Sequence, residues 1–188
     1  MKFLFCTVGI LLFIITKFYK LKNIKYKEPK ILSNKKILTI YYSTGNNTKN
    51  VANCLNSVIG GDIKEIKPIE NYPNNILKMS QTVRRQIKLG YLPEINDIDI
   101  SEYDIIFVGS PIWNFSVSLP AKSFIKKSNF ENKILIPFFT YSGGASKNKI
   151  IKEIKNLTNT KDISKPLFMF ENGFFLTKER IITWLNKL

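Results

Sequence analysis

Short apolar runs alternate with amphipathic stretches along most of this chain. The runs are rich in β-branched and aromatic residues and are bounded by polar or glycine-containing segments, which is typical of buried strands. Between the runs, apolar residues recur at intervals of three and four, as they do on one face of a helix. The predicted strands are Ile37–Tyr42, Ile63–Ile66, Asp104–Gly109, Ile134–Phe139 and Leu167–Phe170. The predicted helices run from Thr48 to Ile59, over 74–90, onward from Pro120, over 150–157 and onward from Thr177.

This alternation of strands and helices predicts one α/β domain in which helices cover both faces of a parallel sheet. Right-handed crossovers between the strands then restrict the strand orders that the chain can adopt. In doubly wound sheets of this kind, ligands bind at the carboxyl ends of the strands, where the winding direction changes. A candidate site is therefore expected in the loops that follow the strands.

The amino-terminal segment differs from the rest because it is almost wholly apolar from Phe3 to Tyr19. As a helix it would be about 25 Å long, close to the short limit for crossing a membrane. No convincing signal-peptide cleavage site follows it, and Cys6 lacks the preceding small residue of a lipoprotein. We therefore expect residues 1–19 to be an uncleaved membrane anchor, followed by a polar tether over 20–35 and the domain over 36–188.

The charge of the chain is strongly positive, and much of the excess lies next to this apolar segment. The formal net charge is +15, and the first 36 residues hold nine lysines against a single acid, Glu28. Most of these lysines follow the apolar segment, which predicts that the domain faces the cytoplasm, where basic side chains can rest on anionic lipid headgroups. Nucleic-acid binding is not expected, because aromatic and basic residues do not alternate along one face.

Histidine is absent from the sequence, and cysteine occurs only at Cys6 and Cys54. The absence of histidine excludes Ser-His-Asp catalysis, histidine general bases and histidine-bound metals. Two cysteines cannot build a four-thiolate zinc or iron–sulfur site within one chain, and Cys54 is expected to be a small buried residue on a helix. Any redox chemistry must therefore come from a bound organic cofactor.

Three of the loops that follow predicted strands carry hydroxyl, amide, aromatic and glycine residues beyond the needs of a simple connection. The first, 43–48, leads into a helix, so its N–H groups could bind an anion, although a capped helix start explains the loop equally well. The second, 110–118, places Trp113 where it could stack on a planar ring or pack in the core. The third, 140–146, has two glycines, which suit either a close ligand approach or a flexible turn. Because all three loops are expected at the same edge of the sheet, a ligand site is favoured over three unrelated connections.

The residues of these loops resemble those of the flavodoxin family, over about 36–188. The segments that carry the resemblance are YYSTGNNTKNVA (41–52), PEINDIDISEYDIIFVGSPIWNFSVSLPAKSFI (93–125) and IPFFTYSGGASKN (136–148). The resemblance implies a flavodoxin-like, doubly wound, five-stranded parallel sheet of order 2-1-3-4-5 and a noncovalently bound FMN.

The resemblance also implies a role for each loop. The first would bind the FMN phosphate, the second would border the isoalloxazine ring, and the third would cover the other side of that ring. The cofactor-binding residues would be Ser43, Thr44, Gly45, Asn46, Asn47, Thr48, Pro111, Ile112, Trp113, Asn114, Thr140, Tyr141, Ser142, Gly143 and Gly144. We therefore expect an FMN-binding electron-transfer protein held at the membrane, working with a redox partner protein. An NAD(P)H-dependent flavin or quinone reductase and a flavin-free binding domain are the alternatives.

Overall fold

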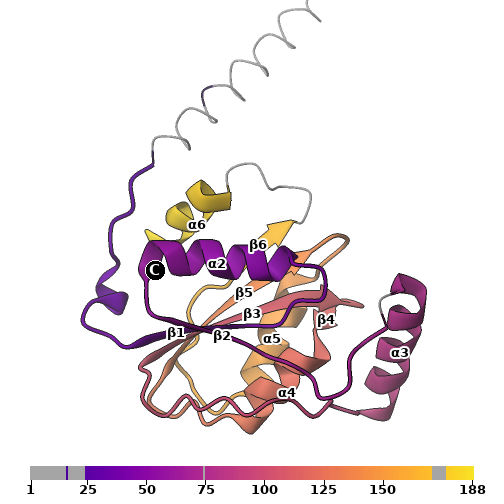
Figure 1. Ribbon diagram of the computed structural model, residues 1–188. Helices are drawn as coiled ribbons and strands as arrows, with labels where there is room; N and C mark the ends of the chain where they lie inside the picture. The colour runs from indigo at the N-terminus through magenta and orange to yellow at the C-terminus, as the bar shows by residue number, and fades with distance from the viewer. Residues whose placement is uncertain (1–15, 17–23, 74, 171–176) are drawn as a thin grey trace, which may run out of the picture.

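Five parallel strands form the main sheet of the domain, in the order β2-β1-β3-β5-β6 (Figure 1). The structure is a computed structural model that describes Thr16 and residues 24–73, 75–170 and 177–188. The strands are β1 (Ile37–Tyr41), β2 (Asp62–Glu65), β3 (Ile105–Trp113), β5 (Ile134–Tyr141) and β6 (Leu167–Phe170). A further two-residue strand, β4 (Ser116–Val117), pairs with the end of β3 and lies off the main path. The main path therefore confirms the predicted order 2-1-3-4-5.

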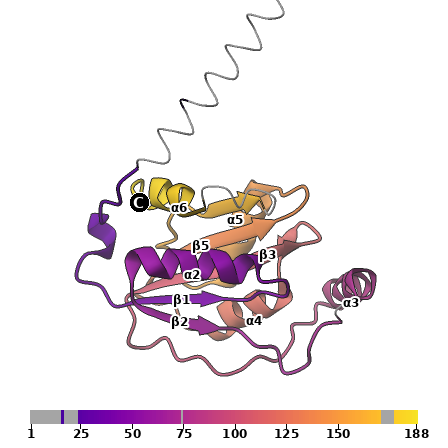
Figure 2. The ribbon, with the colours of Figure 1, turned by 45° about the horizontal axis from the view of Figure 1, so that its top comes forward.

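Helices cover both faces of this sheet (Figures 1 and 2). The side chains of the central strands β1, β3 and β5 alternate between two apolar cores. Ile105 and Phe107 of β3 join the core shared with α2 and α6, while Ile106 and Val108 join the core shared with α4 and α5. This alternation is the period-2 geometry of a strand buried on both faces. The helical elements are η1 (Lys30–Leu32), α2 (Asn47–Ile59), α3 (Ile76–Leu89), α4 (Leu119–Lys127), α5 (Lys147–Leu157) and α6 (Thr177–Leu185).

The predicted ends of β3 and β5 are wrong, because both strands continue into segments that were expected to be loops. Pro111 pairs with Thr140 in the parallel ladder between β3 and β5. Ile112 and Trp113 then pair with β4 in an antiparallel hairpin. Proline is uncommon inside strands, so the local sequence points to a loop there, whereas the pairing partners lie far away in the chain.

The segment 24–35 packs against the domain, which corrects the expectation that a tether over 20–35 lies outside the fold. Leu32 is 2% exposed and belongs to the core that contains α6. Asn186, directly after α6, accepts a hydrogen bond from the Lys27 N–H and donates one to the Lys25 carbonyl, both at 3.0 Å. The lysines of the segment suggested a solvated chain, but its apolar side chains gain enough from burial to dock it.

The predicted membrane anchor over 1–19 lies outside the described residues, apart from Thr16. Cys6 lies outside them as well. In the described parts of the chain, no helix is both long enough and apolar enough to cross a membrane.

Thr39, at the centre of β1, is fully buried, and its Oγ1 has no hydrogen-bond partner among the described residues. Valine has nearly the same shape, lacks the hydroxyl and favours a strand. We expect Thr39→Val to raise the free energy of unfolding by about 1 kcal/mol, because it removes an unsatisfied buried polar group. Urea denaturation of the two proteins measures the difference. A loss of stability on substitution would contradict the unpaired state of this hydroxyl.

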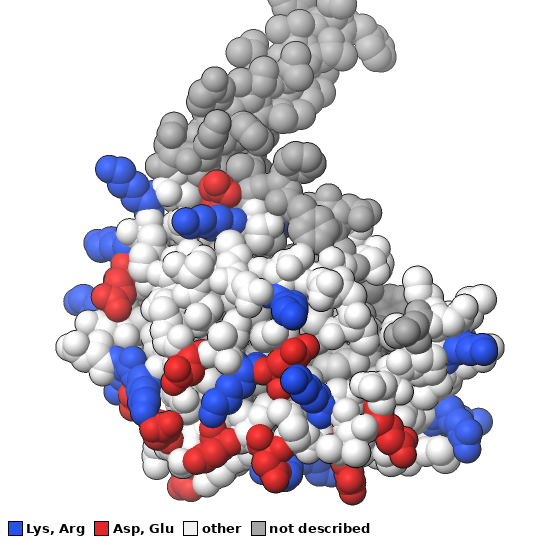
Figure 3. Space-filling model, viewed as in Figure 1, with Lys and Arg blue, Asp and Glu red and all other residues white. Residues whose placement is uncertain are grey.

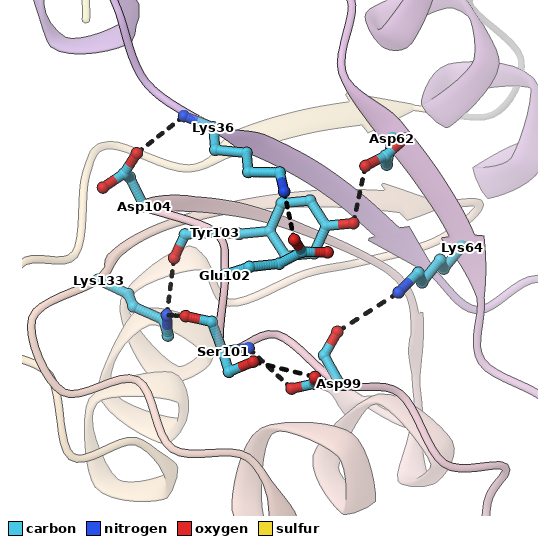
Figure 4. A network of polar contacts seen from close by, with 9 residues as sticks. All are labelled: Lys36, Asp62, Lys64, Asp99, Ser101, Glu102, Tyr103, Asp104 and Lys133. Carbon is cyan, nitrogen blue, oxygen red and sulfur yellow. Dashed lines mark hydrogen bonds and ion pairs between the residues drawn. The ribbon is translucent and has the colours of Figure 1, made fainter.

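A network of polar contacts lies at the amino-terminal edge of the sheet (Figure 4). Tyr103 Oη donates to Asp62 Oδ2 at 2.7 Å, and Lys133 Nζ donates to the carbonyls of Ser101 and Tyr103 at 2.8 and 2.7 Å. The members of the network are Lys36, Asp62, Lys64, Asp99, Ser101, Glu102, Tyr103, Asp104 and Lys133. Figure 3 shows acidic and basic side chains interspersed over the lower part of the face in view, so the charges there are mixed in sign.

The hydrogen bond to Asp62 raises the pKa of Tyr103 to about 12, and burial adds to this shift. A tyrosine in the unfolded chain ionises near pH 10. The protonated phenol therefore stabilises the fold fully below pH 10, and this contribution is lost as the pH rises toward 12. In thermal unfolding at constant ionic strength, we expect the wild type to lose stability between pH 10 and 12 more steeply than Tyr103→Phe. Equal slopes would contradict the assignment.

Candidate functional site

The segments that follow β1, β3 and β5 meet at one edge of the sheet, because these three strands are neighbours (Figure 2). The Tyr42 N–H, directly after β1, donates to the Gly109 carbonyl of β3 at 3.0 Å. The hydroxyls of Thr48 and Thr140 form a buried hydrogen bond of 2.8 Å, which joins the start of α2 to the end of β5. The candidate loops therefore lie together at the carboxyl edge, where doubly wound sheets bind their ligands.

Residues 43–47 form a polar turn with an exposed tip before α2. Thr44, Gly45 and Asn46 are exposed, and Ser43 and Asn47 are half-buried. Asn46 is the N-cap of α2 and adopts a left-handed conformation with φ 65°. Within the described chain, no side chain caps this helix start and no acidic residue lies in its first turn. A bound anion would satisfy the N–H groups that the first turn leaves without helical partners.

Thr48 differs from the rest of this loop because it is only 1% exposed. Its hydroxyl is bonded to that of Thr140, which is 2% exposed. In this structure the two threonines tie the first and third loops together and do not present their hydroxyls to solvent. The helix begins at Asn47, so the predicted start at Thr48 is one residue late.

Trp113 packs in the core beside the site, which is the second of the two roles that the sequence left open. Its side chain is 8% exposed and meets the rings of Tyr42 and Tyr72 edge-on, at centroid distances of 5.4 and 4.9 Å. Burial raises the pKa of both phenols, that of Tyr72 to about 12. Because the side chain is buried in this cluster, Trp113 supports the hairpin and exposes little of its ring for stacking. The preceding Pro111 is buried, and Ile112 is half-buried.

Phe115 is the aromatic residue of the second loop that the structure exposes, and the sequence analysis missed it. It exposes 57% of its surface at the turn between β3 and β4, next to the exposed Asn114. A methyl group added to Gly144 would come within 3.2 Å of its ring, so the turn touches the third loop. Asn114 was the available signal, since asparagine favours the tight turns that join paired strands.

The third loop exposes its two glycines to solvent, whereas its first residues pack against the protein. Ser142, Gly143 and Gly144 are exposed, and a Cβ added at Gly143 would meet nothing within 4 Å. Tyr141 is half-buried and packs edge-on against Phe170, with the ring centroids 5.4 Å apart. The backbone of this loop is therefore accessible to a ligand beside the Phe115 ring.

The chemistry of these groups fits an anion together with a flat aromatic molecule. The donors are backbone N–H groups, hydroxyls and amides, and no cluster of metal-ligating side chains occurs in the described part of the chain. Cys54 is half-buried on α2, and burial raises the pKa of its thiol, which makes it a poor nucleophile. A surface hollow lined mainly by residues of 95–101 and 127–133 lies at the opposite edge of the sheet, away from these donors.

Comparison with known proteins gives the same kind of fold. The family whose sequence profile matches residues 36–188 is described as Flavodoxin. A flavoprotein from Lactobacillus acidophilus NCFM, crystallised in complex with FMN, is 27% identical with a TM-score of 0.58, and the match covers 72% of this chain and 92% of that chain. A candidate flavoprotein from Bacteroides eggerthii DSM 20697 is also 27% identical, with a TM-score of 0.65 and coverage of 82% and 98%. Another from Bacteroides uniformis ATCC 8492 is 24% identical, with a TM-score of 0.67 and coverage of 80% and 97%. No protein with a curated description matches the chain.

Proposed function

The chain belongs to the flavodoxin family, and we propose that its domain binds FMN at the carboxyl edge of the sheet and carries electrons to or from a partner protein. The observation that carries this proposal is the meeting of three loops around the uncapped first turn of α2. The flavoprotein from Lactobacillus acidophilus, which is similar over most of its length, was crystallised with FMN, and this supports the same cofactor here.

Residues 43–47 would hold the phosphate of FMN. The first turn of α2 offers backbone N–H groups. The side chains of Thr44 and Asn46 add donors at the exposed tip, and the half-buried Ser43 adds one beside it. Hydrogen bonds from such donors to a charged phosphate are about twice as strong as those between neutral groups. The phosphate therefore provides the main anchor and fixes the register of the rest of the cofactor.

The flavin ring would lie against the surface that the β3–β4 turn and the third loop form together. Phe115 offers an exposed ring there, and Gly143 and Gly144 leave the neighbouring backbone accessible. FMN supplies the electron-accepting chemistry when it is bound, so the residues of the chain bind it, orient it and limit its contact with water. The described residues include no histidine, and the redox role of the domain rests on the cofactor alone.

The test is a titration of the purified full-length protein, freed of bound flavin, with FMN, riboflavin and FAD. We expect one FMN per chain, bound more tightly than riboflavin because riboflavin lacks the phosphate. The FMN-loaded protein should accept electrons from dithionite but oxidise NADPH or NADH only slowly in the absence of a partner. Failure to bind any flavin would overturn the proposal. Rapid NAD(P)H oxidation by the loaded protein alone would favour a reductase instead.

We also propose that the apolar segment Phe3–Tyr19 holds the protein at a membrane with the domain on the cytoplasmic side. The support is the sequence itself, an apolar stretch with five lysines at and after its carboxyl-terminal end, over residues 17–27. The full chain is expected in the membrane fraction of expressing cells, resistant to high salt and extracted by detergent. A chain that begins at residue 20 is expected in the supernatant. Equal fractionation of the two proteins would contradict the anchor.

A further inference from the structure

The turn between β3 and β4 holds a bulky aromatic residue in an unfavourable backbone conformation. Asn114 and Phe115 have φ values of 47° and 61°, and they connect the paired residues Trp113 and Ser116. Positive φ at both central residues is the geometry of a type I′ hairpin turn, which prefers asparagine and glycine. Asn114 suits its position, whereas the Cβ of Phe115 crowds the backbone in the left-handed region. Such strain persists only where the surrounding contacts hold it in place.

Burial does not explain why Phe115 accepts this conformation, since more than half of its surface stays exposed. The ring instead lies beside Gly144 of the third loop of the candidate site. A strained residue that presents an apolar ring to solvent at a ligand site is better explained by contact with the ligand than by the stability of the free protein.

The contacts that hold the turn come from Glu153 on α5. Its carboxylate accepts hydrogen bonds from Ser116 Oγ at 2.8 Å and from the Val117 N–H at 3.0 Å. Lys122 of α4 forms an ion pair with the same carboxylate at 2.5 Å. The side chains of Lys122 and Glu153 are only 13% and 21% exposed, so solvent screens the pair weakly. Glu153 therefore fixes the two residues that directly follow Phe115 to both helices on this face of the sheet.

We propose that Phe115 is the aromatic contact for the flavin ring and that Glu153 is a positioning residue, which holds the β3–β4 turn so that the Phe115 ring stays beside Gly144. This inference rests on the proposed function, because it needs a flavin at the site. It assigns the stacking role to Phe115 in place of Trp113, which is buried against Tyr42 and Tyr72.

The test compares FMN and riboflavin titrations of the full-length wild type with those of Phe115→Leu, Phe115→Tyr and Glu153→Ala. Phe115→Leu should weaken both flavins by the same factor, up to about tenfold, because the lost contact is to the ring and not to the phosphate. The fluorescence of the bound flavin should also rise, because an adjacent aromatic ring quenches it. Phe115→Tyr should behave like the wild type. Glu153→Ala should reproduce both effects of Phe115→Leu.

A double variant separates positioning from general stabilisation. Glu153→Ala should add no further weakening in the Phe115→Leu background, since both changes remove the same contact. Glu153→Gln, which keeps one acceptor oxygen, should give an intermediate effect. It replaces the alanine variant if circular dichroism shows that Glu153→Ala is unfolded. Glu131→Ala is the matched control, because it removes an exposed acid near the start of β5, at the opposite edge of the sheet.

Each outcome bears on a different statement. If the wild type binds neither flavin, the proposed function fails and this inference fails with it. If the wild type binds FMN but Phe115→Leu leaves both affinities and the fluorescence unchanged, the inference is overturned and the proposed function stands. If Glu153→Ala lowers stability without changing the flavin signals, or if its effect adds fully to that of Phe115→Leu, the positioning role is overturned.

Discussion

The Thr44→Glu protein is expected to bind FMN at least about 100-fold more weakly than the wild type, with little change in its affinity for riboflavin. Thr44 lies at the exposed tip of the turn before α2, where the proposed phosphate site is. Two negative charges about 4 Å apart near a protein surface repel each other by about 4 kcal/mol, more than the ~2.7 kcal/mol of a 100-fold change. Riboflavin carries no phosphate, so this repulsion does not act on it.

The sign of a second effect makes this prediction specific. A carboxylate near the amino terminus of a helix stabilises the helix, so the flavin-free Thr44→Glu protein should be as stable as the wild type or slightly more stable. Thr44→Gln is the matched control, since it has the same size without the charge, and its FMN affinity should fall much less. Isothermal titration with both flavins and urea denaturation of the free proteins give the measurements. An equal loss of FMN and riboflavin affinity would place the phosphate elsewhere.

Gly109→Ala is expected to lower the free energy of unfolding by about 3 kcal/mol, near the upper end of the usual cost of overpacking a core. Gly109 lies in β3 opposite Phe138 of β5, and an added Cβ would come within 2.2 Å of the Phe138 ring. Phe138 is fully buried, so its ring has no free space into which it can turn. The substitution therefore forces β3 and β5 apart at the centre of the sheet, directly beneath the candidate site.

Two further variants show whether this contact is the cause. Gly45→Ala is the control for the loss of a glycine, because an added Cβ there meets nothing within 4 Å, and its stability should equal that of the wild type. Gly109→Ala combined with Phe138→Leu should recover part of the lost stability, since leucine leaves room beside residue 109. A Gly109→Ala protein that loses less than about 1 kcal/mol in urea denaturation would contradict the close packing.

The strand order and the shared edge of the three loops could be predicted because both depend on the alternation of apolar and amphipathic segments. The carboxyl ends of β3 and β5 could not, because the strand status of Pro111 and Thr140 depends on their pairing with each other across the sheet. A short stretch of sequence contains only one member of such a pair. The prediction for that stretch therefore follows the local preference of proline and hydroxyl residues for loops.

The exposed aromatic ring beside the third loop could not be predicted for a related reason. Tryptophan at the end of an apparent strand suggests a stacking residue, but the extension of β3 by two-residue pairing with β4 turns Trp113 toward Tyr42 and Tyr72. The same extension moves the exposed position to Phe115. The identity of the exposed ring therefore depends on a hairpin that Asn114 signals only weakly.

The docking of residues 24–35 has a mechanical consequence. The contacts of Asn186 with the backbone at residues 25 and 27, and the insertion of Leu32, attach this segment to α6 before the chain enters β1. A pull on the chain ahead of residue 24 would therefore load these hydrogen bonds and the Leu32 contact first. The central strands, and the loops that they carry at the far edge, would be relieved of that load until the segment detaches.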